Sequence, residues 1–260
     1  MITETNSVKT VFITGASSGI GRACAIRLAT QGHRLILNAR RREKIDELAG
    51  YLKKEFQTHV MKLIFDVRDK EAVFAEINGL PEDWKNIDVL VNNAGLALGL
   101  ADLHEADIRD WEQMIDTNIK GLLYVSKAII PGMIERKKGQ IINIGSIAAK
   151  ENYLKGNVYC ATKHAVDSIN QAMRMELLPH NIRVNLVNPG ATNTEFSLVR
   201  FKGDKTAADN VYKGFKPLTG EDIADCISFC IELPEHVNIN DMLIMPTAQA
   251  RASMIYKQNN

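Results

Sequence analysis

A glycine-rich turn between a predicted strand and a predicted helix is the feature that most restricts the fold of this chain. Residues 8–14 form an apolar run typical of a buried strand, and residues 22–29 are predicted to be helical. The turn between them reads Thr14-Gly15-Ala16-Ser17-Ser18-Gly19-Ile20-Gly21. Free N–H groups at the start of such a helix bind phosphate, and glycines let the backbone approach it. The turn therefore indicates a dinucleotide site, although its Gly-x-x-x-Gly-x-Gly spacing differs from the commoner Gly-x-Gly-x-x-Gly.

Predicted strands and helices alternate along the rest of the chain. Further strands are expected at 34–39, 60–65, 87–91, 140–145, 183–187 and, last, 242–245. Further helices are expected at 43–56, 71–77, 111–136, 159–178 and from the cap at Thr219 through Cys230, with a loop at 81–83. The pattern predicts one α/β domain over residues 1–260, a doubly wound Rossmann-type fold with a mainly parallel seven-stranded sheet flanked by helices. Residues 1–7 are expected to be flexible.

The residues after the second predicted strand bear on the choice of cofactor. An acid at that place would bind the ribose 2′-hydroxyl of NAD, but here Asn38 and Ala39 are followed by Arg40, Arg41 and Arg42. Guanidinium groups grip a 2′-phosphate, and arginine at a helix start is otherwise unfavourable for the helix dipole. The sequence therefore predicts NADP(H), with Arg40 and Arg41 as its contacts.

Tyr159 and Lys163 form the strongest candidate for catalysis. Residues four apart lie on one helix face, so the ammonium would lie near the phenol and favour its ionised form. Bringing a tyrosine from pKa ~10 to neutrality takes about 4 kcal/mol, more than one lysine supplies, but a lysine and a positively charged nicotinamide together would suffice. The same spacing also occurs in ordinary surface pairs, so the pair alone decides nothing.

Two more polar residues, Ser146 and Asn118, are candidates for the catalytic site because of where they occur in the predicted elements. Ser146 directly follows a predicted strand. Asn118 interrupts an otherwise apolar helical pattern, and asparagine is a poor helix former, so it predicts a backbone interruption or a ligand.

Composition and charge limit the possible partners. A net charge of +1 gives no bulk reason to expect nucleic acid or an anionic membrane. No apolar run reaches the ~18 residues of a membrane span, and the start lacks a signal-peptide pattern, so a cytoplasmic location is expected. The spacing of the cysteines and histidines predicts no metal site.

Together these motifs resemble those of the short-chain dehydrogenases/reductases, from about Val8 to the C-terminus. The matching motifs are the turn 14–21, Asn92-Asn93-Ala94-Gly95, Asn118, Ser146, Tyr159-x-x-x-Lys163 and Pro189-Gly190. The resemblance implies that Tyr159 is the general acid/base and that Lys163 lowers its pKa and binds the nicotinamide ribose. It further implies that Ser146 holds the substrate oxygen and that Asn118 positions a water linking Lys163 to solvent.

The resemblance also suggests the cofactor contacts, which come mostly from turns that follow the strands. The candidates are Gly15, Ser17, Ser18, Gly19, Ile20, Gly21, Arg40, Arg41, Asp66, Val67, Asn93, Ala94, Gly95, Tyr159, Lys163, Pro189, Gly190, Thr192 and Thr194. The segment from about 191 to 215 is expected to be a substrate lid.

Three segments, 93–99, 194–204 and 233–240, are more narrowly similar to the NADP-dependent 3-hydroxy acid dehydrogenases. That group oxidises serine, L-allo-threonine and related acids, reduces malonic semialdehyde, and forms homotetramers. The match departs at 150–155, which is more charged, and at 189–193, which is shorter by about one residue. Ser146 and Tyr159 would contact the substrate, and Arg200 and Lys202, with Lys155 behind them, are the candidates for binding its carboxylate.

Two other functions remain open from the sequence. The first is an NADPH-dependent carbonyl reductase for uncharged ketones or aldehydes, which would share the same four catalytic residues. The second is a non-catalytic NADP-binding redox sensor, which would keep the glycine-rich turn but lose the tyrosine or the lysine.

Overall fold

A computed structural model describes residues 8–258 of the chain, so the segment 1–7 lies outside the described residues. Its central sheet has seven strands in the order β3-β2-β1-β4-β5-β6-β7, and all six pairings are parallel. The strands are β1 (Thr10–Thr14), β2 (Arg34–Asn38), β3 (Val60–Leu63), β4 (Val89–Asn92), β5 (Gly139–Ile144), β6 (Ile182–Pro189) and β7 (Asp241–Ile244). The predicted doubly wound fold is confirmed.

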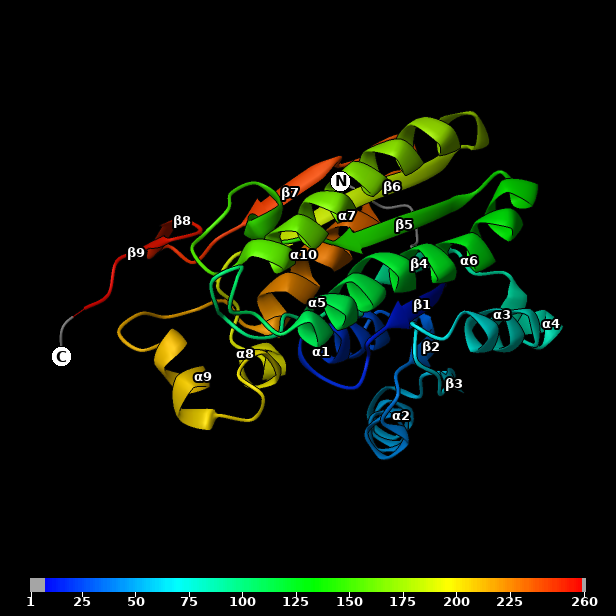
Figure 1. Ribbon diagram of the computed structural model, residues 1–260. Coiled ribbons are helices and arrows are strands. Elements are labelled where there is room, and N and C mark those ends of the chain that lie inside the picture. Colours follow the sequence, from blue (N-terminus) through cyan, green and yellow to red (C-terminus); the bar gives the residue numbers. More distant parts are fainter. Residues whose placement is uncertain (1–7, 259–260) are drawn as a thin grey trace.

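Helices cover both faces of this sheet (Figure 1). One face packs against α1 (Gly19–Ala29), α2 (Arg42–Phe56) and α10 (Gly220–Glu232). The other packs against α3 (Lys70–Asn78), α4 (Glu82–Lys85), α6 (Leu122–Arg136) and α7 (Asn157–Leu177), while α5 (Ile108–Ile115) packs on α7. The predicted cap of α10 is present as a capping box in which Thr219 and Asp222 bond reciprocally.

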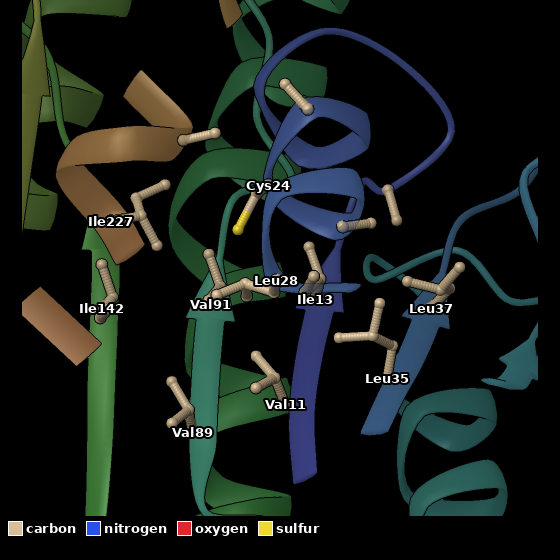
Figure 2. Close-up of a cluster of buried hydrophobic side chains, with 14 of the residues drawn as sticks. Val11, Ile13, Cys24, Leu28, Leu35, Leu37, Val89, Val91, Ile142 and Ile227 are labelled. Atoms are coloured by element: carbon tan, nitrogen blue, oxygen red, sulfur yellow. The ribbon is translucent and has the colours of Figure 1, made fainter. Parts of the chain in front are cut away.

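The alternation of side chains along each strand explains why both faces are apolar. Val11 and Ile13 of β1 point into the cluster with Cys24 and Leu28 of α1, as Figure 2 shows. Phe12, between them, belongs to the cluster on the opposite face. Because a central parallel strand is buried on both sides, it needs an uninterrupted apolar run, which residues 11–13 provide.

A six-residue π-helix, Asp116–Gly121, separates α5 from α6. It contains Asn118, so the backbone interruption expected there is present. Such π-helical turns are rare and are frequently found at functional sites. Gly121 ends the turn against Val67, whose Cγ2 would lie 2.7 Å from a Cβ at position 121.

Two short helices and a hairpin lie at one end of the sheet (Figure 1). They are α8 (Glu195–Arg200), α9 (Lys205–Val211), β8 (Gln249–Arg251) and β9 (Met254–Ile255). The prediction of 242–245 as the last strand was therefore wrong, because β8 and β9 are too short to give an alternating pattern. The loop predicted at 81–83 was wrong in part, since a one-turn helix starts at Glu82 and buries Trp84. None of the helices between residues 8 and 258 has the length and apolarity to cross a membrane.

Candidate active site

A cavity of about 580 Å³ opens where the carboxyl ends of β1, β4, β5 and β6 meet. Strands β1 and β4 are neighbours in this sheet, and the order of the strands along the chain reverses between them. Ligands of α/β sheets usually bind at such a reversal. The predicted residues that line the cavity are Gly15, Ser17, Ser18, Gly19, Ile20, Arg40, Arg41, Asp66, Val67, Asn93, Ala94, Gly95, Ser146, Tyr159, Lys163, Pro189, Gly190, Thr192, Thr194 and Arg200. The structure therefore brings together residues that are up to 185 positions apart in the chain (Arg200 minus Gly15).

The glycine-rich turn has the geometry of a phosphate cradle. Gly15 and Gly19 have φ values of +66° and +52°, which side chains rarely adopt. The first bond of α1 runs from the Arg22 N–H to the Ser18 carbonyl, so the N–H groups of the three preceding residues are free of the helix ladder. Gly21 lies behind the cavity wall, where a Cβ would come within 2.5 Å of Asn93 Nδ2. This packing is the reason that a third glycine is needed.

Arg41 stands at the mouth of that turn. Its guanidinium donates to Ser17 Oγ at 3.0 Å and to Ser18 Oγ at 2.8 Å, and it forms an ion pair of 2.9 Å with Glu195 at the start of α8. Asn38, where an NAD-binding acid would stand, instead donates its amide to the carbonyls of Leu63 and Phe65. The cationic and hydroxyl groups at this end fit a phosphate better than a bare ribose hydroxyl.

Arg40 contacts Asp66 loosely at 3.4 Å, whereas Arg68 holds the same carboxylate at 2.7 Å. Burial raises the pKa of Asp66, but the hydrogen bonds from Arg68 outweigh it and keep that pKa below its ordinary value. Sequence reasoning missed Arg68, although its place two residues after Asp66 was the available signal.

Tyr159 and Lys163 lie one turn apart on the buried face of α7, and both line the cavity. The Lys163 ammonium donates to the Ile144 carbonyl at 2.8 Å, and burial lowers the pKa of Lys163 to about 8. Burial raises the pKa of Tyr159, while a hydrogen bond from Ser146 and the charge of Arg200 lower it only partly. The expected depression of the phenol pKa by Lys163 is therefore not found: this chain's own groups leave it above its ordinary value.

The Asn118 side chain holds neighbouring segments together. Its Oδ1 accepts from the Leu96 N–H at 2.9 Å, and its Nδ2 donates to the Leu96 carbonyl and to Thr162 Oγ1. It thus ties the π-helix to the turn after β4 and to α7, behind the cavity wall.

Of the two predicted carboxylate ligands, the structure brings only Arg200 to the cavity. The Arg200 guanidinium lies 5.6 Å from the centre of the Tyr159 ring and donates to the Tyr153 hydroxyl at 2.9 Å. Lys202 lines a second cavity of about 270 Å³, which adjoins the first at Tyr159 and Arg200, and it pairs with Asp110 at 2.8 Å. Lys155 lines that second cavity as well and pairs with Asp102. Lys202 does not line the first cavity, because after α8 ends at Arg200 the chain turns away through a left-handed Lys202.

Sequence reasoning missed many of the lining residues, and three of them make direct contacts within the site. Tyr153 orients Arg200, Phe196 packs against the Tyr159 ring at 5.6 Å, and Gln249 Oε1 accepts from the Ala191 N–H at 2.7 Å. Nothing in the sequence marked Gln249, which reaches the cavity from β8. Between residues 8 and 258, no cluster of three or more histidine, cysteine or acidic side chains is arranged to hold a metal ion.

Sequence comparison with known proteins identifies a family and several similar relatives. The family model for short chain dehydrogenases matches residues 9–204. The NADP-dependent 3-hydroxy acid dehydrogenase of Schizosaccharomyces pombe is 44% identical over 251 residues, covering 96% of this chain and 97% of that protein. The protein of the same name from Escherichia coli strain K12 is 44% identical over 245 residues, covering 94% and 97%.

Two solved structures of serine dehydrogenases are similar to this chain in both fold and sequence. The closed form of a serine dehydrogenase complexed with NADP+ superposes with a TM-score of 0.90 at 43% identity, covering 96% of this chain and all of that one. The serine dehydrogenase from Escherichia coli superposes with a TM-score of 0.80 at 40% identity, covering 93% and 99%.

Proposed function

This chain belongs to the short-chain dehydrogenase/reductase family, and on that premise we propose that it transfers a hydride between NADP(H) and a small 3-hydroxy acid or its semialdehyde or 3-oxo acid. Serine, L-allo-threonine and 3-hydroxypropionate represent the substrate class. Relatives at 44% identity carry names with this cofactor and this class, and a structure at 43% identity is a serine dehydrogenase with NADP+. The observation that carries the proposal is a guanidinium, that of Arg200, beside Tyr159 in the cavity that the glycine-rich turn enters.

The residues present fit NADP. The free N–H groups at the start of α1 would hold the pyrophosphate, and the guanidinium of Arg41, with the hydroxyls of Ser17 and Ser18, would hold the 2′-phosphate. When bound, NADP would accept or deliver the hydride and, as the oxidised ring, add a positive charge near Tyr159. That charge would add to the partial lowering of the phenol pKa by Ser146 and Arg200.

Tyr159 is the group proposed to move the proton. In oxidation its phenolate would take the substrate hydroxyl proton, and in reduction its phenol would return it. The Ser146 hydroxyl would hold the same oxygen, so that proton transfer and hydride transfer act on one fixed carbon–oxygen bond. Lys163, fixed on the Ile144 carbonyl, would bind the nicotinamide ribose.

Arg200 is proposed to bind the substrate carboxylate. A 3-hydroxy acid brings a negative charge into a partly buried site, where it needs a cation. Arg200 is half-buried and is oriented by the Tyr153 hydroxyl and the Gly99 carbonyl, to which its Nε donates at 3.2 Å. Those two bonds leave further guanidinium donors for a carboxylate.

A carbonyl reductase for uncharged substrates is the second candidate, favoured by the apolar part of the lining. Leu154, Phe196 and Val199 line the same cavity, and two of the Arg200 donors are already used. The non-catalytic sensor is disfavoured, because Asn118, Ser146, Tyr159 and Lys163 are all retained.

Three further properties complete the proposal. The chain is one catalytic domain in which residues 191–215, including α8 and α9, act as the substrate lid. It assembles as a homotetramer, for which exposed apolar side chains on α6, α7, α10 and β7 offer surface (Leu123, Met175, Phe229 and Leu243). It works in the cytoplasm, consistent with four free thiols.

The test is a panel of substrates followed by NADPH absorbance and fluorescence. Serine, L-allo-threonine, 3-hydroxypropionate and malonic semialdehyde are compared with neutral alcohols and aldehydes of the same length. The proposal is supported if kcat/KM is higher for the acids than for the neutral compounds, and higher with NADP than with NAD. Preference for the neutral compounds would favour the carbonyl reductase instead, and failure of every compound would favour the sensor.

A further inference from the structure

A chain of hydrogen bonds links the backbone of Ser146 to the edge of the sheet. The Ser146 N–H donates to Asn188 Oδ1 at 2.9 Å, and Asn188 Nδ2 donates to Asp241 Oδ1 at 3.1 Å. Asn188 is fully buried near the end of β6, and Asp241 opens the neighbouring strand β7 (Figure 1). The position of Ser146 is therefore coupled to a carboxylate that lies outside the cavity.

Lys150 closes this chain into a ring. Its ammonium donates to the second carboxylate oxygen of Asp241 and, at 2.6 Å, to Asp167 of α7. Lys150 directly follows a 3₁₀ turn (Ile147–Ala149), and Ser146 directly precedes it. The same turn is thus fixed at its start through Asn188 and at its end through Lys150, both acting on Asp241.

Gly145 provides independent evidence that this contact is built in. A Cβ at position 145 would lie 1.9 Å from Asn188 Oδ1, closer than any side chain permits. Only glycine before Ser146 lets the asparagine reach the Ser146 N–H. The hydrogen bond from the Ser146 N–H to Asn188 therefore requires a glycine at position 145.

The ring has a direct consequence for the hydroxyl of Ser146. Its Oγ accepts from the Ala148 N–H at 3.1 Å, which leaves the hydroxyl hydrogen free to donate into the cavity. The Ser146 hydroxyl, which lines the same cavity as Tyr159, lowers the pKa of the phenol. A drift of the turn would move this hydroxyl away from the phenol and change the proton chemistry of Tyr159.

We propose that Asn188, Asp241 and Lys150 are positioning residues that hold Ser146 against Tyr159 through the 3₁₀ turn. This inference rests on the proposed function, since it assumes that Ser146 and Tyr159 act on the substrate oxygen. Burial lowers the pKa of Lys150, but Asp167 and Asp241 outweigh it, so the ammonium keeps its charge at neutral pH.

The test compares Lys150→Met with Lys150→Arg, which restores the charge. Lys138→Met is the matched control, because it removes an ion pair of 2.6 Å with Glu235 at the other end of β5. Hydrogen exchange of the Ser146 amide is measured together with the pH dependence of kcat for oxidation and the Kd of NADP. The exchange measurement needs no turnover.

For Lys150→Met we expect at least tenfold faster exchange of the Ser146 amide and a kcat about tenfold lower. A tenfold loss is smaller than the full contribution of general acid–base catalysis, because Tyr159 is still present. The acidic limb of the kcat profile moves to higher pH, because the pKa of the Tyr159 phenol rises when Ser146 no longer lowers it. The other titratable groups that face Tyr159 (Tyr153, Cys160, Lys163 and Arg200) and Arg174, which faces Asp167, are unchanged in the variant. Lys150→Arg restores both readouts, and Lys138→Met leaves both at wild-type values.

Wild-type Ser146 exchange and an unmoved pH limb in Lys150→Met would overturn the inference. If that variant fails to fold, Asp241→Asn carries the same test, since it keeps an oxygen for the Asn188 amide and removes the charge that Lys150 binds. A wild-type protein with no turnover on any substrate would refute the proposed function. The Ser146 exchange comparison would still decide whether the ring positions this residue.

Discussion

The Lys163 ammonium donates a hydrogen bond of 2.8 Å to the main-chain carbonyl of Ile144, two residues before Ser146. This bond joins α7 to the end of β5 and holds the lysine against the cavity wall. Only 7% of Lys163 is exposed, and its charge is otherwise surrounded by buried groups. The fold therefore keeps a destabilising cation in place beside Tyr159.

Replacing Lys163 with Met is expected to stabilise the fold while abolishing activity. Burial lowers the pKa of Lys163 from 10.5 to about 8, so the native state binds fewer protons than the unfolded state between those two values. The stability cost of the charge is then fully present below pH 8 and disappears as the pH rises toward 10.5. Lys163→Met should raise the free energy of unfolding at pH 7 by about 1–3 kcal/mol. Urea unfolding at several pH values measures this, and a gain that persists above pH 10.5 would contradict it.

Replacing Arg200 with Ala should discriminate between charged and neutral substrates. Loss of a charge-assisted hydrogen bond of about 1.5–3 kcal/mol would raise the KM for serine or 3-hydroxypropionate by roughly 10- to 100-fold. A neutral alcohol of the same length should be affected far less. Lys202→Ala is the matched control, because that cation pairs with Asp110 at the second cavity. Equal losses for acids and neutral alcohols would reject Arg200 as the carboxylate ligand.

Arg41→Ala should lower the preference for NADP over NAD. The guanidinium is held at the glycine-rich turn by two serine hydroxyls, so its loss should raise the KM for NADP about tenfold or more and leave that for NAD nearly unchanged. Arg40→Ala should have a smaller effect, since Arg40 is more exposed and only loosely paired. Steady-state kinetics with both cofactors test this, with Arg27→Ala on α1 as the control. A proportional loss with NAD would mean that Arg41 does not read the 2′-phosphate.

Gly21→Ala should destabilise the cofactor end of the protein. The new Cβ would meet Asn93 Nδ2 and the Gly15 carbonyl at 2.5 Å, so the turn must shift, which we expect to cost about 1–3 kcal/mol. Gly50→Ala is the matched control. It lies in α2 with no atom within 4 Å of the new Cβ, and should stabilise the helix by up to ~1 kcal/mol. Thermal unfolding compares the two, and an unchanged Tm for Gly21→Ala would contradict the packing seen here.

Local patterns explain what could be predicted from the sequence. Gly15 and Gly19, between an apolar run and a helical pattern, indicate a strand–turn–helix unit, and Asn118 signals a backbone interruption because it is a poor helix former in an apolar pattern. Tyr159 and Lys163 share one helix face by spacing alone. Such features need no knowledge of the tertiary fold.

The errors arose where position depends on the path of the chain. Lys202 lies only two residues after Arg200, but a left-handed backbone turns it toward Asp110 and the second cavity. Gln249 reaches the site from a hairpin too short to predict, and the pKa of Tyr159 depends on burial, which the sequence does not give. The ring through Asn188 and Asp241 likewise depends on which strands are neighbours.

The most direct measurement of the central claim is turnover by Tyr159→Phe, with NADP affinity measured on the same protein. The claim is that the phenol of Tyr159 moves the proton while other groups bind the cofactor. It predicts a kcat at least ~10²-fold lower, within the range for a positioned acid/base, and an unchanged Kd for NADP. Tyr51→Phe, on the exposed part of α2, controls for the loss of a phenol and should keep wild-type kcat. A Tyr159→Phe enzyme with kcat within a few-fold of wild type would contradict the claim.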